Sequence, residues 1–113
     1  MKRNSLEADM RKIPETYIEF TKQYPEVATA YESLAGACHE SGPLKQKDRA
    51  LVKLGIAIGS WTEGAVRSQV RKGLDAGLNP DEIRQAFILA LTSIGFAKMM
   101  AALTWVEDIL ERE

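Results

Sequence analysis

The segment from Asn79 to Gly95 constrains the fold of this chain more than any other. It begins Asn79-Pro80-Asp81-Glu82, which supplies a helix N-cap, a proline suited to the first helical position, and acids that favour the positive end of the helix dipole. The apolar residues that follow recur every three or four positions, as on one face of an α-helix. They are Ile83, Ala86, Phe87, Ala90, Leu91 and Ile94. A stripe this wide has to be buried against other elements, and Gly95 predicts where the helix ends.

The rest of the chain divides into helical segments at proline and glycine. Gly42 followed by Pro43 predicts a firm helix end, because glycine adopts positive φ easily and proline cannot continue the helix. The apolar run within residues 45–59 has a pattern that is compatible with a buried strand or a buried helix. The run is longer than a typical strand, which favours a helix. We therefore predict an all-α, compact bundle of about six helices, whose segments begin near Pro14, Pro25, Lys45, Trp61, Pro80 and Phe96.

The length of 113 residues predicts a single domain over residues 1–113, because domains of roughly 100–150 residues are the commonest. Residues 1–12 are highly charged, so they fit either a flexible tail or a short docking helix, and they lack the apolar run of a signal peptide. The longest uncharged stretch, Ala86 to Ala97, is about half of the roughly 20 residues that span a bilayer. No membrane association is expected.

Charge and cysteine content narrow the classes of partner. The 15 basic and 16 acidic residues leave almost no net field to attract nucleic acid or anionic lipid. The joint before residue 80 is also a poor DNA-binding helix–turn–helix, because Phe87-Ile88-Leu89-Ala90-Leu91 offers no polar side chain to base edges. Cys38 is the only cysteine, which excludes an intrachain disulfide and a Cys-x-x-Cys centre, so a cytoplasmic location is expected.

The apolar stripes are wider than six short helices can cover with one another. Monomers rarely expose large contiguous apolar patches, so this surplus predicts surface that is buried between subunits. A homo-oligomer is the natural expectation.

Two segments carry a resemblance to a known family. Leu44-Lys45-Gln46-Lys47-Asp48-Arg49-Ala50-Leu51-Val52-Lys53-Leu54 is similar to the opening of the core helix in the carboxymuconolactone decarboxylase and alkylhydroperoxidase D-like family. Residues 68–83, which read SQVRKGLDAGLNPDEI, resemble the family signature His-Val-x-x-Ala-Leu-x-x-Gly-x-x-x-x-Glu-Ile. The resemblance runs from Leu44 to the C-terminus, and it implies an alkylhydroperoxidase D-like helical fold that assembles as trimers or hexamers.

The resemblance also shows which of the family's chemical groups are missing. Ala50 stands in the place of the family's glutamate, and Gln69 in the place of its histidine. The paired cysteines of the peroxidase branch would fall at Thr62 and Ala65. A peroxidase thiolate needs a neighbouring base, and neither a methyl group nor an amide exchanges protons at neutral pH. The family's peroxidase mechanism therefore cannot operate at these positions.

The resemblance implies that the decarboxylase branch also uses a histidine at this position to move a proton. Gln69 cannot act as that base. Its amide can still orient a ligand, as both donor and acceptor. We therefore take Gln69, Glu63 and Thr62 as candidate catalytic residues, although Glu63 lies roughly 120° around the helix from Gln69. Trp61, Ala65 and Ala50 are the candidate pocket residues, while Trp61 and Trp105 also fit a role as packing anchors.

Cys38 and His39 are the only cysteine and histidine, and neighbours on a helix point about 100° apart, which is poor geometry for a nucleophile and its base. Cys38 is expected in the core, as free cysteine often is, and Arg67, Arg71 and Arg84 mostly on a solvated face. One histidine and one cysteine do not make a metal site, so neither a metal nor a cofactor is expected.

Three functions remain open at the level of sequence. The first is a cofactor-free protein that acts on or binds a small organic acid. If it is an enzyme, we expect a decarboxylase, lyase-like or alkylhydroperoxidase-like activity. The second is a non-catalytic oligomeric binding or scaffold protein, because the glutamate, both cysteines and the histidine are lost together. The third is weak peroxiredoxin-type activity through Cys38, which requires an accessible thiol with a lowered pKa.

Overall fold

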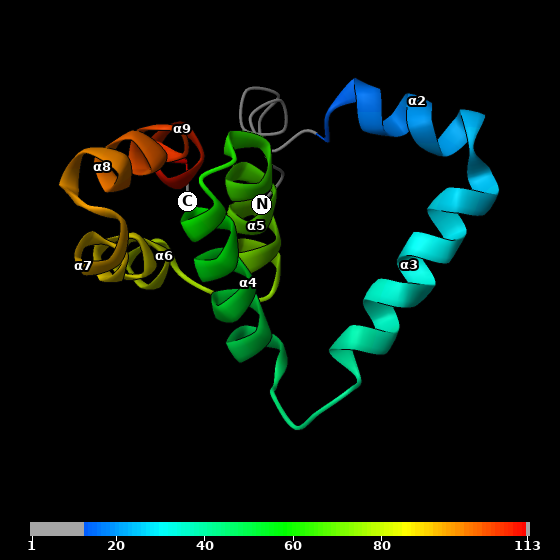
Figure 1. Cartoon of the computed structure of the whole chain (residues 1–113), viewed down its shortest axis with the longest axis horizontal. Coiled ribbons are helices and arrows are strands. Elements are labelled where there is room, and N and C mark those ends of the chain that lie inside the picture. The colour runs from blue at the N-terminus through cyan, green and yellow to red at the C-terminus, as the bar shows by residue number, and fades with distance from the viewer. Residues whose placement is uncertain (1–12, 113) are drawn as a thin grey trace.

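The structure is a computed structural model that describes residues 13–112 (Figure 1). The predicted alternatives for residues 1–12 lie outside this range. All regular elements within it are helices, which confirms the all-α prediction. They are α2 (Glu15–Gln23), α3 (Pro25–His39), α4 (Gln46–Ser60), α5 (Glu63–Asp75), α6 (Pro80–Leu89), α7 (Leu91–Ile94), α8 (Phe96–Thr104) and α9 (Glu107–Leu110).

The clearest predicted helix start has the expected geometry. The Asn79 side chain accepts a hydrogen bond from the backbone N–H of Glu82 at 2.8 Å, and the Glu82 carboxylate accepts one from the backbone N–H of Asn79 at 2.9 Å. This reciprocal capping box satisfies two N–H groups that a helix end otherwise leaves without partners. The start of α6 is therefore set by residues within one helical turn.

Two predicted segments are each divided in two. At Ala90 the N–H bonds to the carbonyl of Phe87, three residues back, and this tightened turn separates α6 from α7. A similar tightening, from the N–H of Val106 to the carbonyl of Leu103, separates α8 from α9. The last two predicted helices thus bend around the core rather than run straight through it.

The predicted helix start at Trp61 is wrong by two residues. α4 continues to Ser60, and Trp61 closes it in the left-handed conformation with φ 55° and ψ 45°. That conformation is uncommon for a bulky side chain. Here the indole is held from two sides, because its Nε1 donates to the carbonyl of Lys98 at 3.0 Å and its ring lies 5.0 Å from that of Trp105.

The core lies between α4, α5, α6, α8 and α9, which form the body on the left and centre of Figure 1. α4 and α5 run side by side, and α6 crosses them. Removing each large aliphatic or aromatic side chain from water contributes about 1.5–3 kcal/mol. The largest fully buried side chains are Phe87, Leu54, Ile58, Ile83, Ile109, Leu110, Val66, Val70 and Val106.

α2 and α3 form an arm that extends away from this body (Figure 1). Among the described residues of the arm, Ala28 alone is a buried hydrophobic residue. The Cα radius of gyration is 14.9 Å, against about 13 Å expected for a compact chain of this length. The arm therefore accounts for a radius somewhat above that of a fully compact chain.

The prediction that Cys38 is buried is wrong for the single chain, in which this cysteine is exposed. Cys38 shares one face of α3 with Val27, Tyr31 and Leu34, which recur at helical spacing, but the core does not cover that face. Helical periodicity identifies an apolar face without identifying what packs on it. Tyr31 and Leu34 remain 61% and 62% exposed.

Candidate functional site

Ala50 on α4 and Gln69 on α5 line one pocket of about 270 Å³. The structure thus brings together the two positions at which the resemblance places a missing glutamate and a missing histidine. The pocket lies where the first half of α4 faces the second half of α5, with the end of α3 closing one side. Its other lining residues are His39, Gln46, Arg49, Lys53, Lys72, Asp75 and Ala76.

Positive charge gathers on this pocket. Arg49, Lys53 and Lys72 all line it, and the Nζ of Lys53 lies 3.2 Å from Nε2 of His39. Burial lowers the pKa of Lys72, and the charges of Lys53 and Arg71 lower it further. Lys72 is therefore repelled by the cations beside it, and an anion placed among them would relieve that repulsion. The pocket is therefore suited to a negatively charged ligand.

The cationic groups were missed at the level of sequence, although a signal for two of them was present. Lys53 follows Ala50 by three residues, and Lys72 follows Gln69 by three, so each lysine shares a helix face with its candidate position. His39 had no such signal. It reaches the pocket because α3 turns back toward α4 through residues 40–45, which is a tertiary feature.

The remaining predicted site residues lie elsewhere on the same two helices. Thr62 is the N-cap residue of α5, Glu63 begins that helix, and both are exposed. Ala65 packs against the hydrophobic core, and Trp61 contacts Trp105. None of these four lines the pocket of Ala50 and Gln69. The predicted constellation is thus split between the start of α5 and the pocket between α4 and the second half of α5.

Two of the arginines expected on a solvated face make defined ion pairs instead. Arg67 on α5 bonds both carboxylate oxygens of Asp108 and the carbonyl of Trp105. Arg84 on α6 lies 3.3 Å from the carboxylate of Glu107. Both pairs hold the start of α9 against the body, so neither arginine is placed to bind a ligand.

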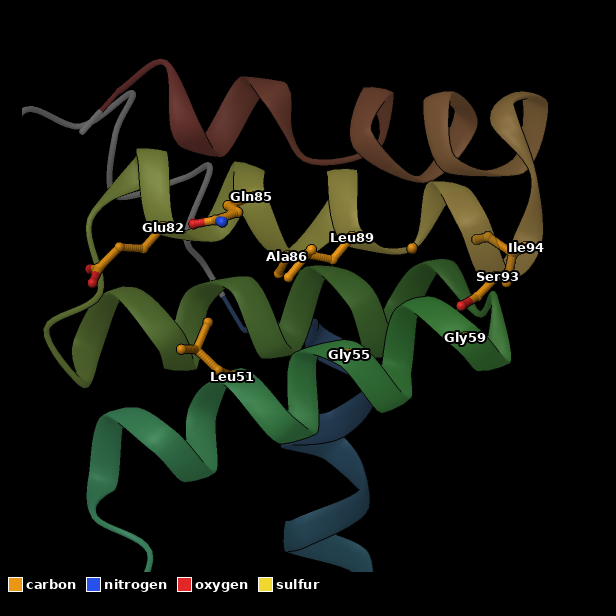
Figure 2. A pocket seen from close by; sticks show the side chains of 10 residues that line it. Leu51, Gly55, Gly59, Glu82, Gln85, Ala86, Leu89, Ser93 and Ile94 are labelled. Atoms are coloured by element: carbon orange, nitrogen blue, oxygen red, sulfur yellow. The ribbon is translucent and has the colours of Figure 1, made fainter.

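A second concave surface lies between α4 and α6–α7, and Figure 2 shows its lining. Gly55 and Gly59 leave one wall without side chains, and a Cβ added at either would meet open space. Leu51, Ala86 and Leu89 supply much of the apolar surface. This groove has a volume of about 480 Å³ and contains none of the predicted site residues. It is suited to apolar contact rather than to chemistry.

Two features of the described residues bear on other classes of function. Among residues 13–112, no group of three or more His, Cys, Asp or Glu side chains is arranged to hold a metal ion. No helix in that part of the chain has the length and apolarity needed to cross a membrane.

Comparison with known proteins supports the resemblance seen in the signature segments. The family model described as "Carboxymuconolactone decarboxylase family" matches residues 25–108, about three quarters of the chain. The match begins at α3, upstream of the segments that carried the resemblance, and includes Ala50 and Gln69. No curated protein and no solved structure matches the chain significantly. With a family match over most of its length, the chain belongs to the carboxymuconolactone decarboxylase family.

Proposed function

We propose that this protein binds a small organic carboxylate, without a cofactor, in the pocket lined by Ala50 and Gln69. The observation that carries the proposal is the convergence of Arg49, Lys53 and Lys72 on that pocket. Hydrogen bonds between ammonium or guanidinium groups and a carboxylate are shorter and about twice as strong as neutral ones. A carboxylate is therefore the ligand group that this lining favours.

The lining residues would contact different groups of the ligand. Lys53 and Lys72 supply charge, and the Gln69 amide supplies a donor and an acceptor for a neutral group of the ligand. Neither Ala50 nor Gln69 can transfer a proton as the family's glutamate and histidine would. For this reason we assign the pocket to binding first, and treat turnover of the bound acid as a separate question.

Titration calorimetry with acetate, succinate and benzoate tests the proposal. We expect saturable binding that Lys53→Met and Lys72→Met each weaken by about tenfold, because a charged hydrogen bond contributes about 1.5–3 kcal/mol. Lys22→Met, on the exposed surface of α2, is the matched control and should bind as the unmodified protein does. If none of the acids binds, or if all three variants weaken binding equally, the pocket assignment is wrong.

Incubation of the bound acid, followed by NMR of the mixture, separates an enzyme from a binding protein. A new product that forms with the unmodified protein but not with a pocket variant would make the protein a cofactor-free enzyme of the decarboxylase or lyase type. The acid recovered unchanged would favour the non-catalytic binding or scaffold alternative. Gln69→Ala is the variant to compare, because its amide is the polar group at the family's histidine position.

We further propose that the protein self-associates through the groove of Figure 2, with trimers or hexamers expected from the family. Leu89 in its wall is 67% exposed, and the neighbouring Ile88 is also exposed. The side-chain-free wall at Gly55 and Gly59 permits the close approach of another helix. Light scattering should give an oligomer, and Leu89→Asp should reduce its mass. A monomer at tens of micromolar, or an unchanged mass in the variant, would contradict this proposal.

A further inference from the structure

An apolar groove of about 400 Å³ lies between α3 and the first half of α4. Its walls include three large apolar side chains that remain half exposed or more, namely Leu34 on α3, Leu44 in the connecting loop and Val52 on α4. The other lining residues are Tyr31, Ala35, Cys38, His39, Ser41, Gly42, Arg49 and Lys53.

This groove adjoins the cationic pocket. His39, Arg49 and Lys53 line both, so they form the boundary between an apolar surface and a positively charged one. Arg49 is held at this boundary, because its Nη1 donates to the carbonyl of Leu44 at 2.6 Å. Lys53 is held there by its 3.2 Å contact with His39. The charge at the junction therefore has a defined position relative to the groove.

We infer that the ligand of this site is an amphipathic carboxylic acid, whose head occupies the pocket of Ala50 and Gln69 and whose hydrocarbon tail lies in the groove between α3 and α4. The inference rests on the proposed function and specifies its substrate class. A purely polar acid would leave the groove empty, and a purely apolar ligand would make no use of the charges of Arg49 and Lys53. Ligand sites commonly combine apolar walls with a few placed polar groups in this way.

The tail makes a quantitative prediction about affinity. Each methylene removed from water contributes about 0.8 kcal/mol when fully buried, which corresponds to about a fourfold gain in affinity. The groove is open on one side, so we expect about two- to fourfold per methylene. Affinity should rise in this way from butyrate to hexanoate to octanoate, measured by calorimetry on the full chain. It should then stop rising once the tail extends beyond the groove.

Variants of the two walls test the location of the tail. Leu34→Asp on α3 and Val52→Asp on α4 should each remove most of the gain in affinity from butyrate to octanoate, because a carboxylate then replaces apolar surface that the tail would contact. Val27→Asp and Ile56→Asp are matched controls, because each lies on the same helix as its partner, is exposed, and lines none of the pockets described above. Circular dichroism confirms that each variant retains its helices.

The outcomes separate this inference from the proposed function. Binding of butyrate and octanoate with equal affinity would overturn the tail assignment and leave the carboxylate pocket intact. Equal effects of the wall variants and their controls would also overturn it, as expected if a second copy of the chain covers the groove. Octanamide binding as tightly as octanoate would overturn the assignment of the head. Failure of every acid to bind would refute the proposed function itself.

Discussion

Arg67 and Asp108 form a two-point ion pair between α5 and α9. Nη1 and Nη2 of Arg67 lie 3.0 and 3.1 Å from the two carboxylate oxygens of Asp108. The residues are 41 positions apart in sequence, and Nη1 also donates to the carbonyl of Trp105. This arrangement holds the C-terminal helix over the end of the core that contains the paired tryptophans.

Replacement of Arg67 by methionine should destabilise the protein by about 1 kcal/mol. The pair is partly exposed, so its own contribution is modest, but the variant also removes the donor to the Trp105 carbonyl. Urea unfolding followed by fluorescence measures the loss. Arg84→Met is the comparison, because Arg84 meets Glu107 through one 3.3 Å contact and should cost less. An equal or larger loss in Arg84→Met would contradict the ranking.

The same pair predicts how stability depends on pH. The hydrogen bond from Arg67 holds the pKa of Asp108 below its ordinary value of 3.8. A carboxyl group whose pKa is lower in the folded state contributes stability above its unfolded pKa, and that stability disappears as the pH falls through the folded pKa. The difference in unfolding free energy between the unmodified protein and Asp108→Asn should therefore be largest near neutral pH and shrink in acid. A difference that grows on acidification would contradict this sign.

The capping box of α6 predicts a second stability effect. Asn79→Ala removes the acceptor for the backbone N–H of Glu82 and should cost about 1 kcal/mol, within a range of roughly 0.5–2. Glu19→Ala, at an exposed position of α2, is the control and should change stability by less than about 0.5 kcal/mol. Thermal unfolding monitored at 222 nm compares the two. Indistinguishable midpoints would mean that the cap does not stabilise α6 in solution.

Two glycines should respond to alanine in opposite directions. Gly77 joins α5 to α6 with φ 100°, where a side chain is strained, so Gly77→Ala should destabilise by about 1–2 kcal/mol. Gly36 lies inside α3, and a Cβ there would meet no other atom within 4 Å. Gly36→Ala should therefore stabilise the helix by about 0.5–1 kcal/mol. Denaturant titrations of both variants test the pair, and the same sign in each would refute the argument.

Cys38 provides a chemical test of the arm. Its thiol is exposed in the single chain, so it should react with an aromatic disulfide reagent at a rate close to that of the urea-unfolded protein. Octanoate should slow this reaction if the acid tail occupies the groove that Cys38 lines. A thiol that is already protected in the absence of ligand would show instead that another subunit covers this face of α3.

Local patterns in the sequence determined the helices and most of their ends. The capping box at Asn79, the glycine and proline at positions 42 and 43, and the apolar spacing act within one or two turns, so they can be read without knowledge of the fold. The same local reading placed helix starts near Pro25 and Pro80, where α3 and α6 begin. It failed at Trp61, whose left-handed conformation depends on contacts with Lys98 and Trp105, 37 and 44 positions away.

The sequence by itself determined the all-α class and, through two signature segments, the resemblance to this family. Only the tertiary structure decided which groups surround Ala50 and Gln69, because side chains from α3, α4 and α5 converge there without any fixed spacing between them. His39 contacts Lys53 across a loop, and the charge of Lys53 on α4 acts on Lys72 on α5. The exposure of Cys38 was likewise decided in three dimensions, since periodicity specifies a helix face and packing alone specifies what covers it.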